Sequence, residues 1–412
     1  MASFACMARA SRPARRGRGA IRPGSGRVRG ARAHGRPWGL VRRPGGGRLC
    51  QAAPIAPHLR RVLFFQTCQN MRRSHRTWLA ILSASLVPAT AAHAQSSLTL
   101  YGVVDAGIYR LARGATSIGN IQRSYWGIKG SEDLGSGYAA MFHLQSRFEI
   151  DTGRLEASGG APLFYGESTV GVKGPFGQLR LGRAMTPMWA LDWQFDPWYN
   201  FDRVASIAWQ IYHPAYRTDP YRNGPAGDYN RANNGVFYDS PVARGWSVHL
   251  AANGERSKVP DANGTVESKR GLAAGINYDD GSATLLVSAE RNSVNDKTYF
   301  VGLAYGSGPT RVMASASLTE LTTASQVFLG EARRRRTSAM LAATHRIGAA
   351  TLKIGVGRDF QGYGRSGATD YVSAGVSYAL SRRTQVYAGV GHGRPSNDGS
   401  RTNVGMGVNH SF

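Results

Sequence analysis

The sequence predicts an all-β fold, a transmembrane barrel of sixteen antiparallel strands. Three observations predict it. Short segments alternate apolar with small or polar residues, these segments recur along most of the chain, and a secretion signal stands before the first of them. Successive side chains of a strand point to opposite faces, so each segment has one apolar face and one polar face. A barrel with lipid outside and water inside needs that division in every strand.

The residues that precede the first predicted strand differ in composition from the rest. Residues 1–94 hold 18 arginines, no lysine and no acidic residue, which leaves 33 basic and 25 acidic residues and a net charge of +8 for 95–412. All three cysteines, Cys6, Cys50 and Cys68, also lie in this first part. The region 95–412 therefore has neither a disulfide nor a cysteine metal site.

Met71–Ala94 is predicted to be a secretory signal peptide. A basic stretch leads into the apolar run Trp78–Val87, which is too short to span a bilayer as a helix. Ala92-His93-Ala94 then fits the small-residue rule for cleavage, so Gln95 is expected to be the first residue of the exported chain.

Residues 1–70 form an extension ahead of this signal that is rich in Arg, Gly and Pro. Such composition occurs in nucleic-acid-binding arms and in transit peptides. A secretion signal normally stands at the start of the translated chain. We therefore expect translation to begin at Met71, and the extension to be a mis-assigned start or disordered, and we exclude it from the predicted fold.

Sixteen segments carry the two-residue alternation. In Tyr371–Leu380, for example, Val372 and Val376 share one face, and Ser373 and Ser377 share the other. The predicted strands cover residues 97–108, 121–131, 138–149, 163–174, 177–183, 232–240, 246–253, 271–279, 283–292, 297–306, 310–319, 336–347, 350–360, 370–380, 384–393 and 401–412.

The connections between the predicted strands are alternately short and long. Seven are short turns, such as Gly135-Ser136-Gly137, and eight are mostly longer loops. Outer-membrane barrels show this asymmetry, with short periplasmic turns and longer external loops. The alternative is a large soluble β-protein, a propeller or a double sandwich, which alternation alone does not exclude. The secretion signal and the lack of cysteine in the exported region favour the membrane barrel.

The connection 184–231 is the longest and has a composition of its own. It holds Trp189, Trp193, Trp198 and Trp209, and it shows neither a clear strand nor a clean amphipathic helix. A loop of this length in a compact fold is usually functional or disordered, and the aromatic content argues against disorder. We expect this segment to lie inside the barrel.

Five stretches resemble the general porins of Gram-negative bacteria, above all the trimeric porins of Burkholderia- and Bordetella-like β-proteobacteria. They follow one another in the family's order from one end of the exported chain to the other. The stretches are Ser97–Gly107, Trp126–Gly137, Phe176–Arg183, Asn233–Pro241 and Val404–Phe412.

The resemblance implies a sixteen-stranded barrel that assembles as a homotrimer, with its third external loop folded into the lumen. It also implies passive diffusion of small hydrophilic solutes and ions across the outer membrane, where lipids, lipopolysaccharide and the barrel-assembly machinery are partners. The terminal Phe412 matches the family's C-terminal assembly signature. Tyr125 departs from the family, which commonly has Arg before Trp126, so one lumenal positive charge is expected to be missing.

Alternation also assigns charged residues to the two faces. Four basic residues alternate with the apolar, outward positions of their strands; we say that such residues have inward parity. We expect these four to form a basic wall of the lumen: Arg123, Lys129, Arg147 and Arg180. Arg183 has outward parity, but it lies where its strand gives way to the long loop, so the parity leaves its direction open and we assign it to the same basic wall.

Asp192, Asp196 and Asp202 of the long loop are expected to face this wall across the lumen. Opposed rows of charge create a transverse field, which governs ion selectivity. The net charge of +8 for 95–412 and the basic wall favour anions. The alternatives are that the arginines only solvate the wall or bind lipopolysaccharide phosphates, and that the aspartates cap turns.

The sequence offers no catalytic, cofactor-binding or metal-binding motif. The histidines of 95–412 lack ligand spacing, and its glycine-rich stretches are not followed by a helix, as a phosphate loop requires. We expect no nucleic-acid binding. Two other functions stay open. One is a substrate-specific channel whose aromatic loop guides sugars or aromatic acids, and the other is an outer-membrane barrel enzyme, for which no clustered nucleophile and histidine are visible.

Overall fold

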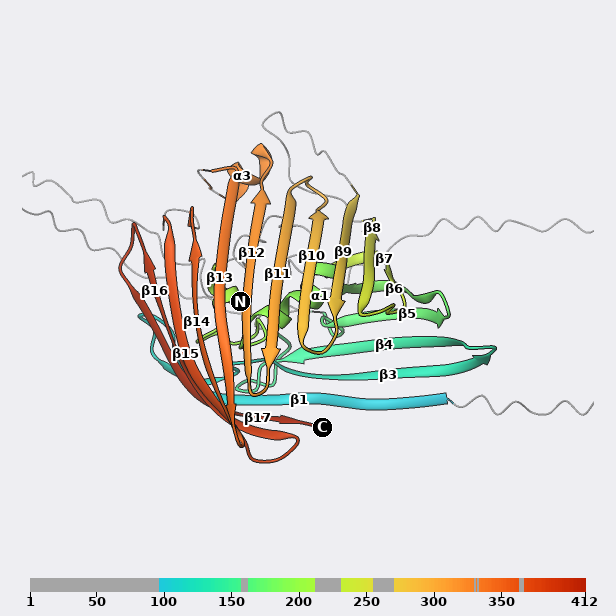
Figure 1. Ribbon diagram of the computed structural model, residues 1–412, viewed down its shortest axis with the longest axis horizontal. Helices are drawn as coiled ribbons and strands as arrows, with labels where there is room; N and C mark the ends of the chain where they lie inside the picture. The colour runs from blue at the N-terminus through green and yellow to red at the C-terminus, as the bar shows by residue number, and fades with distance from the viewer. Residues whose placement is uncertain are drawn as a thin grey trace, which may run out of the picture. The chain divides into compact units, whose positions relative to one another are not determined.

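The computed structural model describes residues 96–156, 162–211, 231–254, 270–329, 331, 333–362 and 367–412 (Figure 1). The predicted signal peptide and the extension before it lie outside these residues. Among the residues described, no helix is both long and apolar enough to span a membrane.

Strands make up most of the described chain. They are β1 (Ser96–Arg110), β2 (Thr116–Gly119), β3 (Ser124–Gly135), β4 (Tyr138–Phe148), β5 (Glu167–Gly174), β6 (Gly177–Met185), β7 (Arg231–Asp239), β8 (Trp246–Asn253), β9 (Gly271–Asp279), β10 (Ala283–Arg291), β11 (Lys297–Ser307), β12 (Thr310–Glu320), β13 (Arg335–Ile347), β14 (Ala350–Asp359), β15 (Thr369–Ala379), β16 (Thr384–Pro395) and β17 (Arg401–Ser411). The helical elements are α1 (Pro187–Leu191), η1 (Asp192–Phe195), α2 (Ile207–Ile211) and α3 (Thr323–Leu329).

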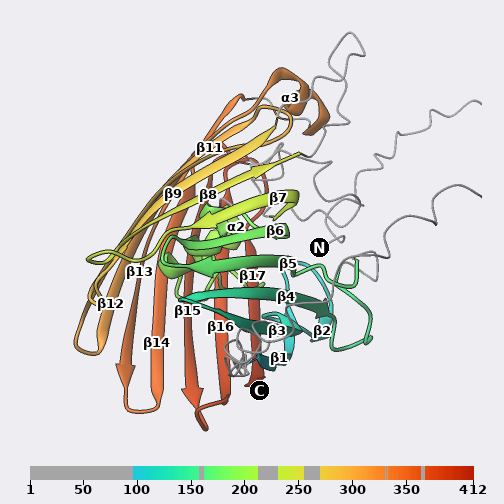
Figure 2. The same cartoon turned by 90° about the vertical axis from the view of Figure 1, so that its right-hand side faces the viewer.

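The strands form one closed antiparallel sheet, and β1 closes it. The half Ser96–Val103 pairs with β3, and the half Val103–Arg110 pairs with β17 (Figure 2). The short β2 pairs with the end of β1 and precedes β3, so β2 and β3 are two parts of one barrel strand. The predicted barrel of sixteen antiparallel strands is confirmed, with one strand interrupted.

The C-terminal residue lies at this closing seam. The N–H of Phe412 donates to the carbonyl of Gly102 at 3.0 Å, and the N–H of Gly102 donates to the carbonyl of Phe412 at 3.1 Å. A β-carbon on residue 102 would overlap the Phe412 ring, so the glycine lets the ring lie over β1.

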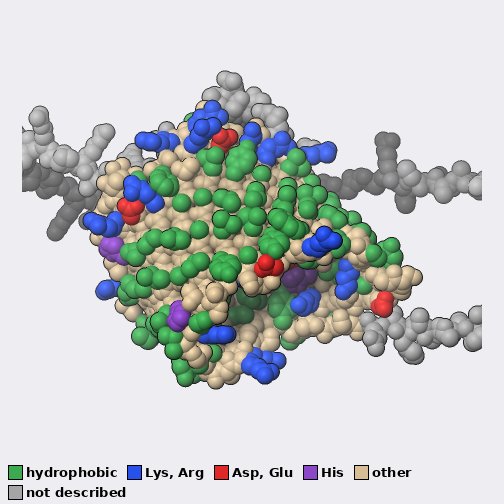
Figure 3. All heavy atoms as spheres, viewed as in Figure 1, with side chains coloured by type: hydrophobic (Ala, Val, Ile, Leu, Met, Phe, Trp, Pro, Cys, Tyr) green, Lys and Arg blue, Asp and Glu red, His purple; other side chains and the backbone are tan. Residues whose placement is uncertain are grey.

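The two faces of the sheet differ in polarity. On β11, Tyr299 and Leu303 are 40 % and 55 % exposed, whereas Phe300 between them is 3 % exposed. On β12, the buried positions include Ser315 and Ser317. Figure 3 shows hydrophobic side chains spread over the strands of the viewed face, with Lys and Arg mostly toward its edges. An exposed apolar face of this kind matches contact with lipid, and the polar face is then the inner one.

The interruption between β2 and β3 is bridged by one buried carboxylate. The N–H groups of Ile121 and Gln122 both donate to Oδ1 of Asp105 at 2.8 Å. The hydroxyl of Tyr387 on β16 donates to Oδ2 at 2.6 Å, and the N–H of Asp105 donates to Ser124 at 2.9 Å. The predicted strand 121–131 therefore begins only at Ser124, because the preceding backbone bonds to a side chain instead of to a neighbouring strand.

We predict that replacing Asp105 with Ala destabilises the barrel, because two backbone donors and one hydroxyl lose a buried acceptor. Each unsatisfied buried group costs about 1–3 kcal/mol. The thermal midpoint of unfolding, followed by the mobility of folded and unfolded protein in gels, should fall. Asp105→Asn keeps an acceptor oxygen and is the matched control. An Asp105→Ala protein that unfolds with the wild-type midpoint would contradict the assigned role.

Candidate functional site

The segment between β6 and β7 is described as far as Ile211, and it contains three short helices, α1, η1 and α2. Pro187 stands in the first turn of α1, where the missing N–H would have no partner in any case. Sequence alone predicted no clean helix here, because four or five residues are too few to show a helical period. The rest of the predicted loop, residues 212–230, lies outside the described residues.

This segment packs against glycines of the inner face. A β-carbon at Gly302 on β11 would meet Phe195, and one at Gly355 on β14 would meet Ile207. The residues beside these glycines along each strand, such as Leu303, are exposed, so the glycines lie on the opposite face. The three helices together contact strands from β8 to β15.

The contact between segment and strands is apolar and tightly closed. Met188, Phe195, Ile207 and Ile211 are fully buried in the largest apolar cluster of the described residues. Full burial of such a side chain is worth about 1.5–3 kcal/mol. The hydroxyl of Tyr371 on β15 also donates to the carbonyl of Val204 at 2.9 Å. The segment is therefore held to the strands along its length.

Two of the predicted loop acids hold the segment in shape. Asp202 accepts the backbone N–H groups of Val204 and Ala205 at 2.8 and 2.9 Å. Asp196 accepts a hydrogen bond from the hydroxyl of Ser206, and both carboxylates are at most 2 % exposed. Their oxygens are thus directed into the segment itself.

Burial dominates the ionisation of all three acids. It raises the pKa of Asp196 to about 6, although the hydrogen bond from Ser206 and the positive charge of Lys353 both act to lower that pKa. It also raises the pKa of Asp202 to about 6, although hydrogen bonds from two backbone N–H groups and the charge of Lys353 act to lower that pKa. The pKa of Asp192 stands well above its ordinary value, because burial is joined by repulsion from Glu290 and Asp196.

Lys353 on β14 is a cation whose charge acts on two of these acids. Its Nζ lies 5.4 Å from the ring centroid of Tyr199, and its charge acts on both Asp196 and Asp202. The Tyr199 ring is half exposed and neighbours that of Trp193, with 5.9 Å between the ring centroids. The ammonium group of Lys353 and the exposed rings of Tyr199 and Trp193 thus lie close to one another.

The predicted basic wall is ion-paired. Glu156 lies between Arg147 and Arg123, with closest N–O distances of 3.4 and 3.5 Å. Burial would raise the pKa of Glu156, but Arg123, Arg147 and Arg203 outweigh it and hold that pKa below its ordinary value. The Arg123 guanidinium also lies 4.6 Å from the ring centroid of Phe201.

Arg203 ties the long segment to this wall. Its guanidinium donates to both carboxylate oxygens of Glu149, at 3.1 and 3.2 Å. Its backbone N–H donates to the carbonyl of Ile121 at 2.9 Å, next to the interruption between β2 and β3. The segment therefore contacts the wall of the early strands as well as the strands from β8 to β15.

A second ion-paired group surrounds Arg180 of β6. The guanidinium lies 2.6 Å from Glu167 of β5 and 3.1 Å from Asp239 of β7. His143 contacts the same glutamate at 3.1 Å, and His249 contacts the aspartate at 2.8 Å. Arg180 and both carboxylates have inward parity, so the charges of three neighbouring strands meet on the inner face.

Arg183 joins the same wall despite its outward parity. Its guanidinium donates to the carbonyl of Tyr165 at 3.1 Å and to Asn233 at 2.6 Å. The Tyr165 ring also lies near Arg147, so Arg147 and Arg183 share one aromatic neighbour. The register between β6 and β7 shifts at this point, and such bulges redirect side chains.

Lys129 lies further along β3. Its Nζ is 5.3 Å from the ring centroid of Tyr101, and that ring packs edge-on against Tyr125. Tyr125 therefore contributes an aromatic ring beside the wall.

Sequence reasoning missed several charged residues of this site, among them Lys353, Glu156 and Arg203. Lys353 has inward parity in the predicted strand 350–360, so alternation could have found it. Glu156 and Arg203 lie in connections, where alternation gives no direction. Their partners become visible only when β4, the following loop and the long segment are brought together.

A closed antiparallel barrel with an apolar outer face and ion-paired charges on its inner face defines a β-barrel protein of the outer membrane. Among the described residues, no group of three or more His, Cys, Asp or Glu is placed to hold a metal ion.

The sequence model for Gram-negative porins matches residues 79–398, so the chain belongs to the Gram-negative porin family. Outer membrane porin protein 32 of Delftia acidovorans is 30 % identical over 237 residues, which is 55 % of this chain and 60 % of that protein, less than two thirds of its length. An outer membrane porin protein of Bordetella pertussis is 24 % identical over 81 % of this chain and 99 % of its own.

The fold has solved relatives as well. The anion-selective porin from Comamonas acidovorans superposes with a TM-score of 0.61 and 21 % identity, over 77 % of this chain and all of that one. At this identity the likeness concerns the fold.

The raised pKa values give a prediction about pH. Asp196 and Asp202 have a pKa of about 6 in the folded chain, against ~4 in an unfolded chain. The folded state binds these protons more tightly, so this contribution to stability is complete below pH ~4 and is lost as the pH rises through about 6. The unfolding midpoint of the wild type should decline over that range.

The double variant Asp196→Asn/Asp202→Asn keeps the acceptor oxygens and cannot ionise, so its decline should be shallower. Some decline should persist, because burial also raises the pKa of Asp296 to about 6. A variant that declines as steeply as the wild type would show that other groups titrate.

Proposed function

We propose that the barrel is a water-filled channel of the outer membrane through which small hydrophilic solutes and ions diffuse passively. The observation that carries this proposal is the placement of Arg180, Glu167 and Asp239 on the inner face, with apolar residues on the outer face. Charges placed inside a barrel are tolerated where the lumen holds water, whereas Lys or Arg at the lipid midplane costs about 2–4 kcal/mol.

The long segment is the proposed constriction. Its contacts with inward glycines such as Gly302 and Gly355 support a position within the lumen. Arg203 and Phe201, which contact the wall of the early strands, support a segment that crosses from one side of the lumen to the other. Such a crossing narrows the water-filled cross-section and brings solutes close to the charges.

We assign a weak anion preference to this constriction. Cations outnumber carboxylates at the wall, but most of the cations are paired with a carboxylate. The cations are Arg123, Lys129, Arg147, Arg180, Arg183 and Arg203, and the carboxylates are Glu149, Glu156, Glu167 and Asp239. The solved relative described as anion-selective is consistent with this sign. Asp192, Asp196 and Asp202 contribute through the shape of the segment more than through exposed charge.

Assembly and export complete the proposal. A homotrimer is supported by the related barrel OmpT of Vibrio cholerae, which has been solved in a trimer form. The signal Met71–Ala94 would direct export, and Phe412, placed at the closing seam, would be the C-terminal assembly signature read by the assembly machinery.

A substrate-specific channel is the second candidate, and one observation favours it. The half-exposed rings of Trp193 and Tyr199 lie side by side next to Lys353. Aromatic rings beside an ammonium group suit solutes that carry a flat apolar part and a carboxylate. Channel block by benzoate but not by acetate would favour this candidate over a general porin.

We predict that purified protein in planar bilayers gives large, steady, ohmic current steps with a slight anion preference in a salt gradient. The double variant Arg147→Gln/Arg180→Gln should move the reversal potential toward cations, because Glu156, Glu167 and Asp239 keep their charges. Arg147→Lys/Arg180→Lys preserves the charge and should stay close to the wild type. Absence of steps would sink the proposed channel, and unchanged selectivity in the Gln variant would overturn the assigned wall.

A further inference from the structure

A serine, a histidine and an aspartate form a hydrogen-bonded chain where the short turn joins β7 to β8. Nε2 of His249 lies 2.9 Å from Oγ of Ser247, and Nδ1 of the same ring lies 2.8 Å from Oδ1 of Asp239. Ser247 and His249 are two residues apart on β8, and Asp239 is directly opposite His249 on β7. One imidazole ring therefore bridges a hydroxyl and a carboxylate.

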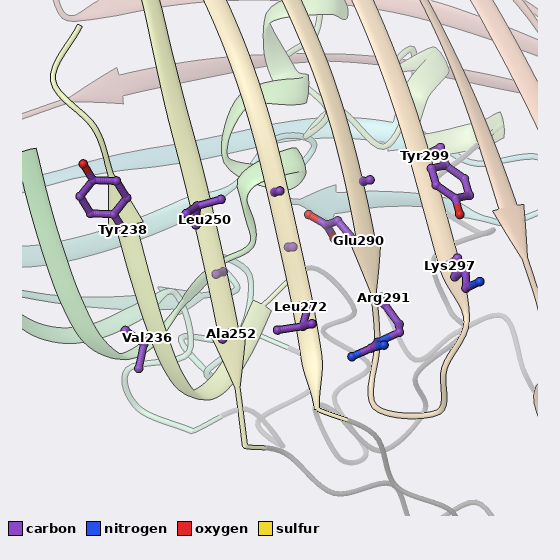
Figure 4. Close-up of a pocket in the computed structure, with 13 residues that line it drawn as sticks. Val236, Tyr238, Leu250, Ala252, Leu272, Glu290, Arg291, Lys297 and Tyr299 are labelled. Atoms are coloured by element: carbon purple, nitrogen blue, oxygen red, sulfur yellow. The ribbon is translucent and has the colours of Figure 1, made fainter.

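All three side chains point into the barrel. Tyr238 of β7 and Leu250 of β8 line a groove on the outer face (Figure 4). Each of the two is the strand neighbour of one member of the chain, Asp239 or His249. Because successive residues of a strand alternate between faces, both members lie on the inner face. Ser247, two residues before His249, points the same way.

The position of the proton on the ring follows from its two partners. A carboxylate only accepts hydrogen bonds, so a neutral imidazole carries its proton on Nδ1, next to Asp239. Nε2 is then an acceptor, and the hydroxyl of Ser247 donates to it. Arg180 contacts the other oxygen of Asp239, Oδ2, at 3.1 Å and leaves Oδ1 to the histidine. An oriented imidazole that accepts the proton of a serine is the arrangement that makes this hydroxyl a nucleophile.

Asn277 of β9 places an amide beside the same serine. It is directly opposite Ser247 in the sheet. The β-carbons of such a pair are about 4.5–5.5 Å apart. Asn277 is 8 % exposed, and its Oδ1 is buried without a hydrogen-bond partner in the described part of the chain. A carboxamide that turns about its last bond presents its NH2 group to the same place, where it can donate to the oxyanion of an acyl transfer.

The surroundings limit what can reach the serine. A β-carbon at Gly275, which is directly opposite His249, would meet Pro187 of α1, so the chain lies beside the proposed constriction. Ser247 is 6 % exposed. The side chains of His249 and Asp239 are 17 % and 29 % exposed. A solute in the lumen therefore approaches from the side of the histidine, and only a small acyl group can reach Oγ.

We propose that Ser247, His249 and Asn277 form an acyl-transfer site that hydrolyses short-chain carboxylic esters inside the barrel. The site rests on the proposed water-filled channel, which brings the ester and the water. Oγ of Ser247 attacks the carbonyl carbon of the ester, and its proton passes to Nε2 of His249. The negative charge that develops on the carbonyl oxygen is stabilised by the NH2 group of Asn277.

The remaining steps return the site to its starting state. The bond to the alcohol oxygen breaks, and the alcohol leaves with the proton that Nε2 held. Water then attacks the acyl group on Ser247 and gives a proton to Nε2. When the bond between Oγ and the acyl carbon breaks, this proton returns to Oγ and the carboxylic acid is released. One ester and one water give one acid and one alcohol, and Asp239 is the positioning residue of the imidazole.

The reactivity of Ser247 separates this site from a chain that only joins β7 to β8. The test treats the purified full-length exported protein in detergent with diisopropyl fluorophosphate, which labels activated serines, and locates the label by peptide mass spectrometry. Ser247 should be labelled. His249→Asn should slow the labelling at least ~100-fold, because the general base is lost.

Hydrolysis of p-nitrophenyl acetate is the second readout. It should be lost in Ser247→Ala and slowed ~100-fold in Asn277→Ala, because one oxyanion donor is removed. Asp239→Asn should also slow it, and Asp239→Glu should restore part of the rate, since orienting the ring needs a carboxylate. Ser288→Ala is the matched control, because that buried inner-face serine donates to the carbonyl of Ala274 at 2.9 Å.

Single-channel steps from each variant confirm that it is folded. The proposal is overturned if Ser247 stays unlabelled, or if His249→Asn is labelled at the rate of the wild type. It is equally overturned if Ser247→Ala hydrolyses the ester as fast as Ser288→Ala does. Labelling in detergent needs no current, and the current needs no reactive serine, so a failure of the site is distinguishable from a failure of the channel.

Discussion

Hydrogen bonding of the backbone is the constraint on which the rest of this structure depends. In lipid, an unpaired N–H or C=O has no water to bond, so the sheet must close on itself. Here β1 is shared between β3 and β17, and Phe412 bonds to Gly102 at the seam. Where the ladder is interrupted between β2 and β3, the carboxylate of Asp105 accepts the backbone donors that the sheet leaves over.

Closure of the sheet separates side chains that face lipid from side chains that face the interior of the barrel. The inner face then carries two kinds of surface, one apolar and one charged. Glycines such as Gly302 and Gly355 leave room for apolar side chains of the long segment on one side. Arg147 and Arg180 meet carboxylates on the other side. The same division leaves large apolar side chains exposed on the outer face.

Strand number and facing could be predicted from the sequence because the two-residue period is local. Parity assigned Arg123, Arg147 and Arg180 to one face, and in the structure each of them pairs with a glutamate. What could not be predicted depends on chain segments that meet only after folding. Glu156 lies in a connection without periodicity and pairs with two arginines. Asp202 turns into its own segment because the backbone N–H groups of Val204 and Ala205 donate to it. Alternation along a strand predicts which face a side chain points to, but it does not predict which residue that side chain contacts.

Thiol accessibility tests most directly the claim that the long segment lines a water-filled lumen. Residues 95–412 contain no cysteine, so single substitutions report cleanly. Tyr199 and Leu303 are similarly exposed, at 53 % and 55 %, but lie on the segment and on the outer face respectively. A charged, membrane-impermeant thiol reagent should reduce the single-channel current of Tyr199→Cys and leave that of Leu303→Cys unchanged. An unaffected current in Tyr199→Cys despite labelling, or block of Leu303→Cys, would contradict the account.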